Sequence, residues 1–167
     1  CRLAQDGGTL YQGFSHASWT KPATASLLTS RLPSSHHAMS KTSVLSPEVD
    51  LLAEVLQGHG YTTGGIVSNI NLAASFGFDQ GFELYDASFA RWGMSNEEAK
   101  LPGVDVSAKA LEWLATIPPD QPYFLFVHFL DSHRPYPVLH PRDLEAQRDR
   151  IAAESRRLIN ETFSSFV

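Results

Sequence analysis

The sequence predicts an α/β domain in which helices flank a mostly parallel sheet. Segments with the apolar period of a helix alternate with segments of strand character, and turns rich in glycine or proline separate them. Strands that are joined through helices pair in parallel. With 167 residues, 43% of them hydrophobic, the chain is long enough to bury one core.

Composition limits the classes of partner and site. The net charge of -5, from 13 basic and 18 acidic residues, gives no basic footprint for nucleic acid. Cys1 is the single cysteine, which excludes an internal disulfide and a cysteine-based zinc site. No apolar run is long enough to cross a bilayer. Localisation and oligomeric state stay open.

The first third of the chain predicts a strand followed by a helix. Residues 3–6 have the pattern of a last helical turn, and residues 9–15 alternate like a strand. Thr20 is predicted as the N-cap of the next helix, with Pro22 inside the first turn, where a missing N–H costs nothing. A loop with two solvated histidines, His36 and His37, is expected to follow.

The middle of the chain continues the alternation. Residues 46–58 predict a helix with Ser46 as its cap and Pro47 at its first position. Residues 61–68 predict a strand with Asn69 at its carboxyl end. The aromatic, glycine-rich residues 71–86 indicate a packed loop and a short strand.

The last third ends in the strongest apolar run. Residues 104–117 predict an amphipathic helix. Residues 123–130 predict a central strand buried on both faces, with His128 as a satisfied core histidine. Residues 139–167 predict a long charged helix. Because the chain starts without Met and stops inside an apolar pattern, we expect it to be a piece of a longer protein.

Polar residues follow each of the three predicted strands: Thr20, then Asn69, then Asp131 with His133. In parallel sheets ligands bind beyond the carboxyl ends of strands, so these residues predict one site. The Thr20 hydroxyl would face unpaired N–H groups and the positive end of a helix dipole, which favour an oxyanion. That environment suits a nucleophile on a phosphate or sulfate ester, whereas the alternative from this stretch alone is a plain capping threonine.

Four segments, in this order, resemble the sulfatase family of the alkaline phosphatase superfamily. They read WTKPATASLLTSRLP from Trp19, GYTT from Gly60, GFDQGF from Gly77 and DSHRPY from Asp131. Together they cover residues 1 to about 140. The resemblance implies part of an alkaline-phosphatase-like sandwich, with residues 1–167 forming a partial sulfatase-like domain truncated at both ends.

The nucleophile segment departs from the family pattern. Sulfatases oxidise the first residue of a Cys/Ser-x-Pro-x-Arg motif to formylglycine, but here Thr20 holds that position and Thr24 replaces the arginine. Threonine cannot become formylglycine. The chain is therefore similar to superfamily members in which an unmodified threonine attacks phosphorus and binds the metal, which implies both roles for Thr20. The family's Lys-x-His after the Gly-Tyr-x-Thr segment is also missing.

The resemblance extends to the other site residues. His133 matches a family histidine that contacts the substrate's oxyanion, so a catalytic role is implied: stabilising the transferring group or protonating the leaving oxygen. Lys21, Asn69 and Asp131 are expected to contact substrate, a solvated surface lysine being the alternative for Lys21. The family implies a divalent metal, Ca, Mg, Mn or Zn, with most of its ligands outside this chain.

The function expected from these features is that of a metal-dependent hydrolase of sulfuric or phosphoric esters, acting on a small anionic ester. The fragment alone is expected to be inactive. One alternative is a phospho-group transferase of the same superfamily. The other is a catalytically inactive sulfatase-like binding module.

Overall fold

The three described strands of the sheet in this computed structural model pair in parallel, in agreement with the mostly parallel sheet that was predicted. The structure describes residues 7–8, 10–88, 103–131, 133, 149 and 153. Their elements are α2 (Thr20–Thr29), α3 (Pro33–His36), α4 (Leu52–Gly58), β1 (Thr62–Val67), η1 (Ile70–Leu72), η2 (Ala74–Phe76), β2 (Leu84–Asp86), α5 (Gly103–Leu114) and β3 (Tyr123–His128). The strand order is β2-β1-β3, and β1 pairs in parallel with both neighbours. The predicted α/β class is confirmed.

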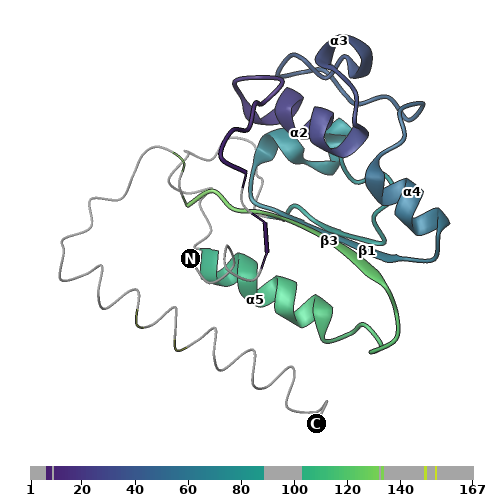
Figure 1. The fold of residues 1–167 in the computed structure, drawn as a ribbon, viewed down its shortest axis with the longest axis vertical. Helices are drawn as coiled ribbons and strands as arrows, with labels where there is room; N and C mark the ends of the chain where they lie inside the picture. Colours follow the sequence, from purple (N-terminus) through teal and green to yellow (C-terminus); the bar gives the residue numbers. More distant parts are fainter. Residues whose placement is uncertain are drawn as a thin grey trace.

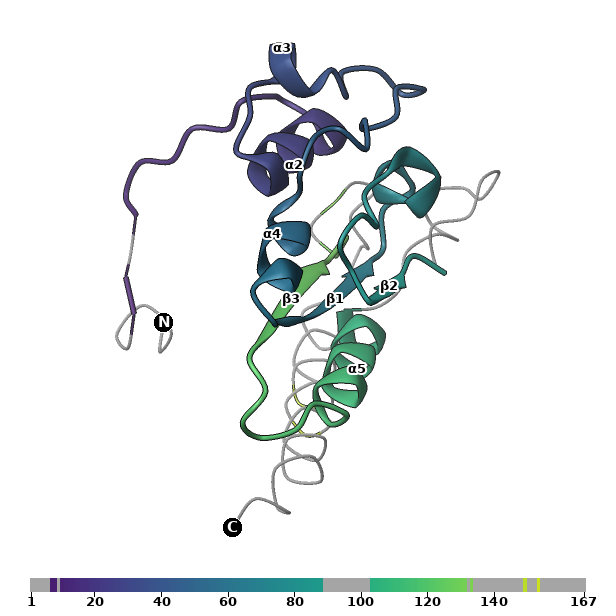
Figure 2. The same ribbon diagram turned by 90° about the vertical axis from the view of Figure 1, so that its right-hand side faces the viewer.

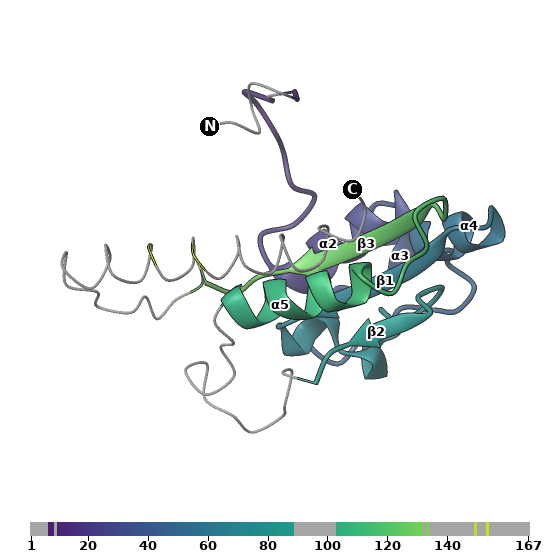
Figure 3. The same ribbon diagram turned by 90° about the horizontal axis from the view of Figure 1, so that it is seen from below.

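Strand register brings the carboxyl ends of all three strands to one edge of the sheet. Gly64 of β1 lies opposite Leu84 of β2 and Leu125 of β3, and Val67 lies opposite His128. Figure 3 shows the three strands side by side. The segments that leave β1, β2 and β3 therefore all start from the same edge, where ligands bind in parallel sheets.

Helices cover both faces of the sheet. The helices α2, α3 and α4 lie on one face, and α5 lies on the other (Figures 1 and 2). The core under α2 consists of nine buried residues: Ala25, Leu28, Ala38, Leu45, Leu51, Val67, Leu72, Phe76 and Phe78. On the α5 face, Ile66, Val106 and Ala110 pack with Leu125 and Val127. No helix in the part of the chain that the structure describes is long and apolar enough to span a membrane.

Two adjacent glycines in β1 allow close packing on both faces. A Cβ atom at Gly64 would lie 2.7 Å from the Trp113 ring, which comes from α5. A Cβ atom at Gly65 would lie 2.5 Å from the Tyr85 ring on the opposite face. Glycine weakens a strand unless another group must approach its backbone closely. Here two aromatic rings do so, one from each side.

The predicted helix starts need correction. Trp19, with φ -146° and ψ 164°, is the N-cap of α2, so Thr20 is already helical and the predicted capping role is wrong. The helix predicted from Pro47 begins only at Leu52. Ser46 closes a separate turn first, because its hydroxyl oxygen and its carbonyl accept from the N–H groups of Glu48 and Val49.

Other expectations differ from the structure at the ends of the sheet. Residues 10–15 form no strand; they belong to an extended arm that leaves the sheet (Figures 2 and 3), and Leu10, Tyr11 and Phe14 on it are exposed. The short helix α3 occupies part of the predicted loop. In the described sheet β3 is an edge strand and only partly buried, whereas a central strand was predicted. The helices expected at residues 3–6 and 139–167 lie outside the described residues, apart from 149 and 153.

Replacing Gly81 tests the packing of the loop that leads into β2. Gly81 has φ +75°, and a Cβ atom there would lie 2.2 Å from the backbone nitrogen of Glu54. We expect Gly81→Ala to lower the free energy of unfolding by about 2–4 kcal/mol, since it adds both strain and a clash with backbone. Gly58→Ala is the matched control, because the space around Gly58 in α4 is open and alanine favours helix. Equal urea midpoints for the two variants would contradict this packing.

Candidate functional site

A hydrogen bond joins the first two predicted site residues across the sheet edge. The Asn69 side-chain amide donates from Nδ2 to the Thr20 hydroxyl at 3.4 Å. The Asn69 Oδ1 atom accepts from the backbone N–H and the side-chain amide of Asn71, at 2.9 and 3.0 Å. These two bonds fix the orientation of the amide, so its NH₂ group faces Thr20. Residues 49 positions apart are thereby brought together.

The Thr20 hydroxyl lies at the amino end of α2. Thr20 is the first helical residue and is partly exposed. The N–H groups of Thr20 and Lys21 have no acceptor within the helix, because no helical carbonyl lies four residues before them, and Pro22 has no N–H. The first turn of α2 contains no acidic residue. The hydroxyl therefore sits at the positive end of a helix dipole that no neighbouring carboxylate in that turn offsets.

Lys21 is fully buried, so the solvated-surface alternative for it is wrong. Its ammonium donates to the carbonyl oxygens of Lys41 and Ser43, at 2.7 and 3.1 Å, and lies 3.2 Å from the centroid of the Phe76 ring. Burial lowers the pKa of Lys21, while the two carbonyls and the ring face offset part of the desolvation cost. The ammonium thus anchors α2 to the 41–43 loop. A contact with substrate, which the sequence suggested, stays a prediction that this geometry does not favour.

His133 and Asp131 follow β3 at the same edge of the sheet but differ in their surroundings. The backbone N–H of His133 donates to the carbonyl of Leu130, in the turn after the strand. The Asp131 Oδ1 atom accepts from the N–H of Gly103 at 2.8 Å, so this carboxylate caps α5, which covers the face opposite α2. One oxygen of the Asp131 carboxylate is therefore bound within the fold. No local pattern predicts this cap, because 28 positions separate the two residues.

His128 differs from the predicted satisfied core histidine. Its Nδ1 atom is buried and has no hydrogen-bond partner in the structure as described. Burial lowers the pKa of His128 and the nearby His133 lowers it further, whereas a contact of the imidazole with the residue's own backbone raises it. Its backbone carbonyl, by contrast, accepts from the Ser68 hydroxyl at 2.8 Å. An apolar run identifies the strand but carries no signal for an unpaired imidazole within it.

Ser26 and His36 have the composition of a nucleophile and its base, but their geometry excludes that chemistry. Both are buried, and Ser26 Oγ lies 3.0 Å from His36 Nε2. Because His36 Nδ1 accepts from the N–H of Ala38 at 3.1 Å, the ring proton is on Nε2. His36 then donates to Ser26 and has no lone pair to take its proton. The pair links α2 to α3, and the prediction of a solvated His36 is wrong.

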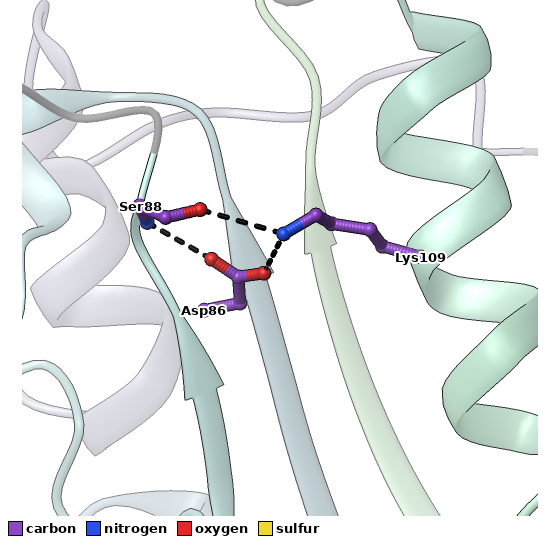
Figure 4. A network of polar contacts seen from close by, with 3 residues as sticks. All are labelled: Asp86, Ser88 and Lys109. Atoms are coloured by element: carbon purple, nitrogen blue, oxygen red, sulfur yellow. Dashed lines mark hydrogen bonds and ion pairs between the residues drawn. The ribbon is translucent and has the colours of Figure 1, made fainter.

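A third polar cluster lies at the end of β2 (Figure 4). The Asp86 carboxylate pairs with the ammonium of Lys109 from α5 and accepts from the N–H of Ser88. Burial alone would raise the pKa of Asp86, but the bonds from Lys109 and Ser88 outweigh it and hold that pKa below its usual range. The side chains are 36% and 20% exposed for Lys109 and Asp86, so the pair is only partly desolvated. It ties β2 to α5 and leaves no free carboxylate for a ligand.

The described residues do not by themselves fit a divalent cation. No group of three or more His, Cys, Asp or Glu side chains among them is placed to hold a metal ion. Hard cations need several converging oxygen ligands, whereas this edge offers the Thr20 hydroxyl. A groove of about 700 Å³ between residues 13–16 and the outer side of α2 is lined by Phe14, His16, Thr24, Leu27 and their neighbours, and none of the predicted site residues lines it.

Comparison with known proteins agrees with this architecture. The family model described as Sulfatase matches residues 1–162. Among solved structures, one that matches is BT4656 in complex with its substrate, D-glucosamine-2-N,6-O-disulfate, with a TM-score of 0.55 and 17% identity. The alignment covers 72% of this chain and 26% of that one, so this chain spans about a quarter of the solved protein. A comparison with curated protein sequences gave no match.

The buried His36 predicts a pH dependence of stability. Burial lowers the folded-state pKa of His36 below its ordinary 6.5, so the unfolded chain binds the proton more readily. The free energy of unfolding should therefore fall as pH drops below about 6.5, by at most about 1.4 kcal/mol per pH unit for this one group. We expect His36→Gln to flatten this slope in urea titrations between pH 5 and pH 7 (roughly the titration range of histidine). The control His59→Gln, at an exposed histidine, should keep the wild-type slope. Equal slopes in both variants would refute the assignment of the pH dependence to His36.

Proposed function

The chain belongs to the sulfatase family, and from this premise we propose that it supplies the nucleophile of a site that hydrolyses sulfate or phosphate esters. The observation that carries the proposal is the placement of the Thr20 hydroxyl. It lies at the amino end of α2, and the amide of Asn69 is directed at its oxygen. Both features stabilise negative charge, on the attacking oxygen or on a bound oxyanion.

The chemistry proposed for Thr20 is a displacement in two steps. Its oxygen bonds to phosphorus or sulfur while the bond to the leaving oxygen breaks, and the hydroxyl proton passes to solvent. Water then attacks the same phosphorus or sulfur atom, which releases the inorganic anion and restores the Thr20 hydroxyl. Because threonine reacts without prior oxidation, this route needs no formylglycine.

His133 is the residue proposed to act on the other side of the reacting centre. It follows β3 at the same edge of the sheet as Asn69, which follows β1. From there its imidazole would stabilise the transferring group or give a proton to the leaving oxygen. The substrate proposed is a small anionic ester; the matching solved protein acts on a sulfated sugar, which belongs to that class.

Sulfatases as a family use a divalent metal, which neutralises charge on the ester when bound. Thr20 is the one described residue that we propose as a ligand, and the remaining ligands would come from parts of the protein outside this chain. A second candidate is a noncatalytic binding module. It is favoured because Lys21 and Asp131, both expected to contact the substrate of an enzyme, form hydrogen bonds within the fold instead.

Replacing Thr20 in the complete protein distinguishes these two functions. Thr20→Ala should reduce kcat on an aryl sulfate or aryl phosphate by roughly a thousandfold or more, since the nucleophile is lost. Its stability should change by less than about 1 kcal/mol, because Thr20 is not the cap and alanine favours helix. Thr20→Ser should retain part of the rate.

The matched control is Thr24→Ala, one turn further along α2. Thr24 is buried and stands where sulfatases carry arginine, but the proposal gives it no role. Its turnover should follow its folded fraction alone. Unchanged turnover in folded Thr20→Ala protein would end the nucleophile assignment, and binding of an anionic ester without turnover by the wild type would favour the binding module.

A further inference from the structure

The geometry points to His128 as a further substrate-binding residue: we propose that its unpaired Nδ1 atom forms a hydrogen bond with the bound sulfate or phosphate ester. This inference rests on the proposed function and adds a contact to the same site. It follows from where β3 ends, which face His128 occupies and which polar atoms around it are already paired.

The register of the sheet places His128 on the same face as α2. Side chains alternate along a strand, and Phe124 and Phe126 of β3 pack into the core under α2, whereas Leu125 and Val127 pack on the α5 face. His128 therefore shares the α2 face, opposite Val67, which belongs to the same core. It is also the last residue of β3, so its imidazole lies at the carboxyl edge of the sheet.

Thr20 lies on that same face and edge. It begins α2, which packs on this face through Ala25 and Leu28, and its hydroxyl contacts Asn69 just beyond the end of β1. His128 is the final residue of the strand next to β1. The imidazole of His128 and the hydroxyl of Thr20 thus approach one corner of the sheet from two elements.

The side chains of Ser68 and Asn69 at this corner are paired, whereas the Nδ1 atom of His128 has no partner among the described residues. Ser68 donates to the carbonyl of His128, and Asn69 uses both its Oδ1 and its Nδ2 atoms. Only two buried side-chain atoms of the described residues lack a partner, and the other, Oε1 of Gln80, belongs to the turn before β2. An unpaired buried polar atom is costly, so it calls for a partner such as water, an ion or a ligand.

The contact proposed is a hydrogen bond to an oxygen of the ester, without proton transfer. A neutral imidazole with hydrogen on Nδ1 can donate to such an oxygen. Because the bond would form with the substrate already bound, its loss should affect KM and the binding of product anions more than kcat.

Three variants of the complete protein test this contact: His128→Phe, His128→Asn and Thr20→Ala. Phenylalanine keeps the ring but removes both nitrogens, whereas asparagine keeps a polar atom near the position of Nδ1. Inorganic phosphate and sulfate are the binding probes, measured by calorimetry, and KM and kcat are measured on an aryl ester. We expect His128→Phe to raise the Kd for the anion and the KM roughly tenfold to a hundredfold, with a Tm no lower than that of the wild type. His128→Asn should stay within about threefold of the wild type, since one hydrogen bond is retained.

Unchanged Kd and KM in His128→Phe would overturn the contact, as would a marked loss of Tm with unchanged Kd, which would show that Nδ1 is paired within the fold. If His128→Phe does not fold, His128→Gln takes its place, because glutamine moves the polar atom away from Nδ1, and the same rise in Kd is expected. Failure of the proposed function is seen separately, as unchanged turnover in Thr20→Ala. The phosphate Kd then still decides the role of His128, and a wild type that binds neither anion overturns both.

Discussion

The buried ammonium of Lys21 is the contact on which the geometry of this site depends. A charge removed from water is tolerated only where other groups replace its hydration, and here two carbonyl oxygens and the Phe76 ring do so. These partners come from the loop after α3 and from η2, so one side chain fixes the first turn of α2 against two distant segments. Thr20 precedes Lys21 directly. Its hydroxyl is therefore held in place by the core.

The parallel sheet contributes both to stability and to the candidate binding site. β1 contributes two glycines at its centre, which admit an aromatic ring from each face, and then Asn69 just beyond its end. The strand therefore packs against aromatic rings at its centre and presents a polar side chain just beyond its carboxyl end. The carboxyl ends of β2 and β3 share this edge, but the carboxylates of Asp86 and Asp131 there both bind groups of α5, the Lys109 ammonium and the Gly103 N–H. The α2 face is left with a hydroxyl, an amide and an imidazole, a set of groups that suits an anionic ester.

Local patterns predicted most elements of this fold, and long-range contacts account for the errors. The helix at α5 and the strands β1 and β3 follow from apolar periodicity, as expected. The placement of Thr20 beside Asn69 follows from the general behaviour of parallel sheets. Burial of Lys21 and His36, in contrast, depends on partners distant in the sequence: the carbonyls of Lys41 and Ser43 for Lys21, and the Ser26 hydroxyl for His36. The Nδ1 atom of His128, which has no partner among the described residues, could not be predicted either, because pairing depends on the folded chain.

The most direct measurement of the central claim is mass spectrometry of the complete protein, quenched in acid during turnover of an aryl sulfate or aryl phosphate. If the Thr20 oxygen attacks the ester, the peptide containing α2 should carry a sulfo or phospho group, and fragmentation should locate it on Thr20. Thr24 and Thr29 lie in the same helix and serve as internal controls. The protein must be quenched in the steady state, while it turns over substrate. An unmodified α2 peptide under these conditions would contradict the account.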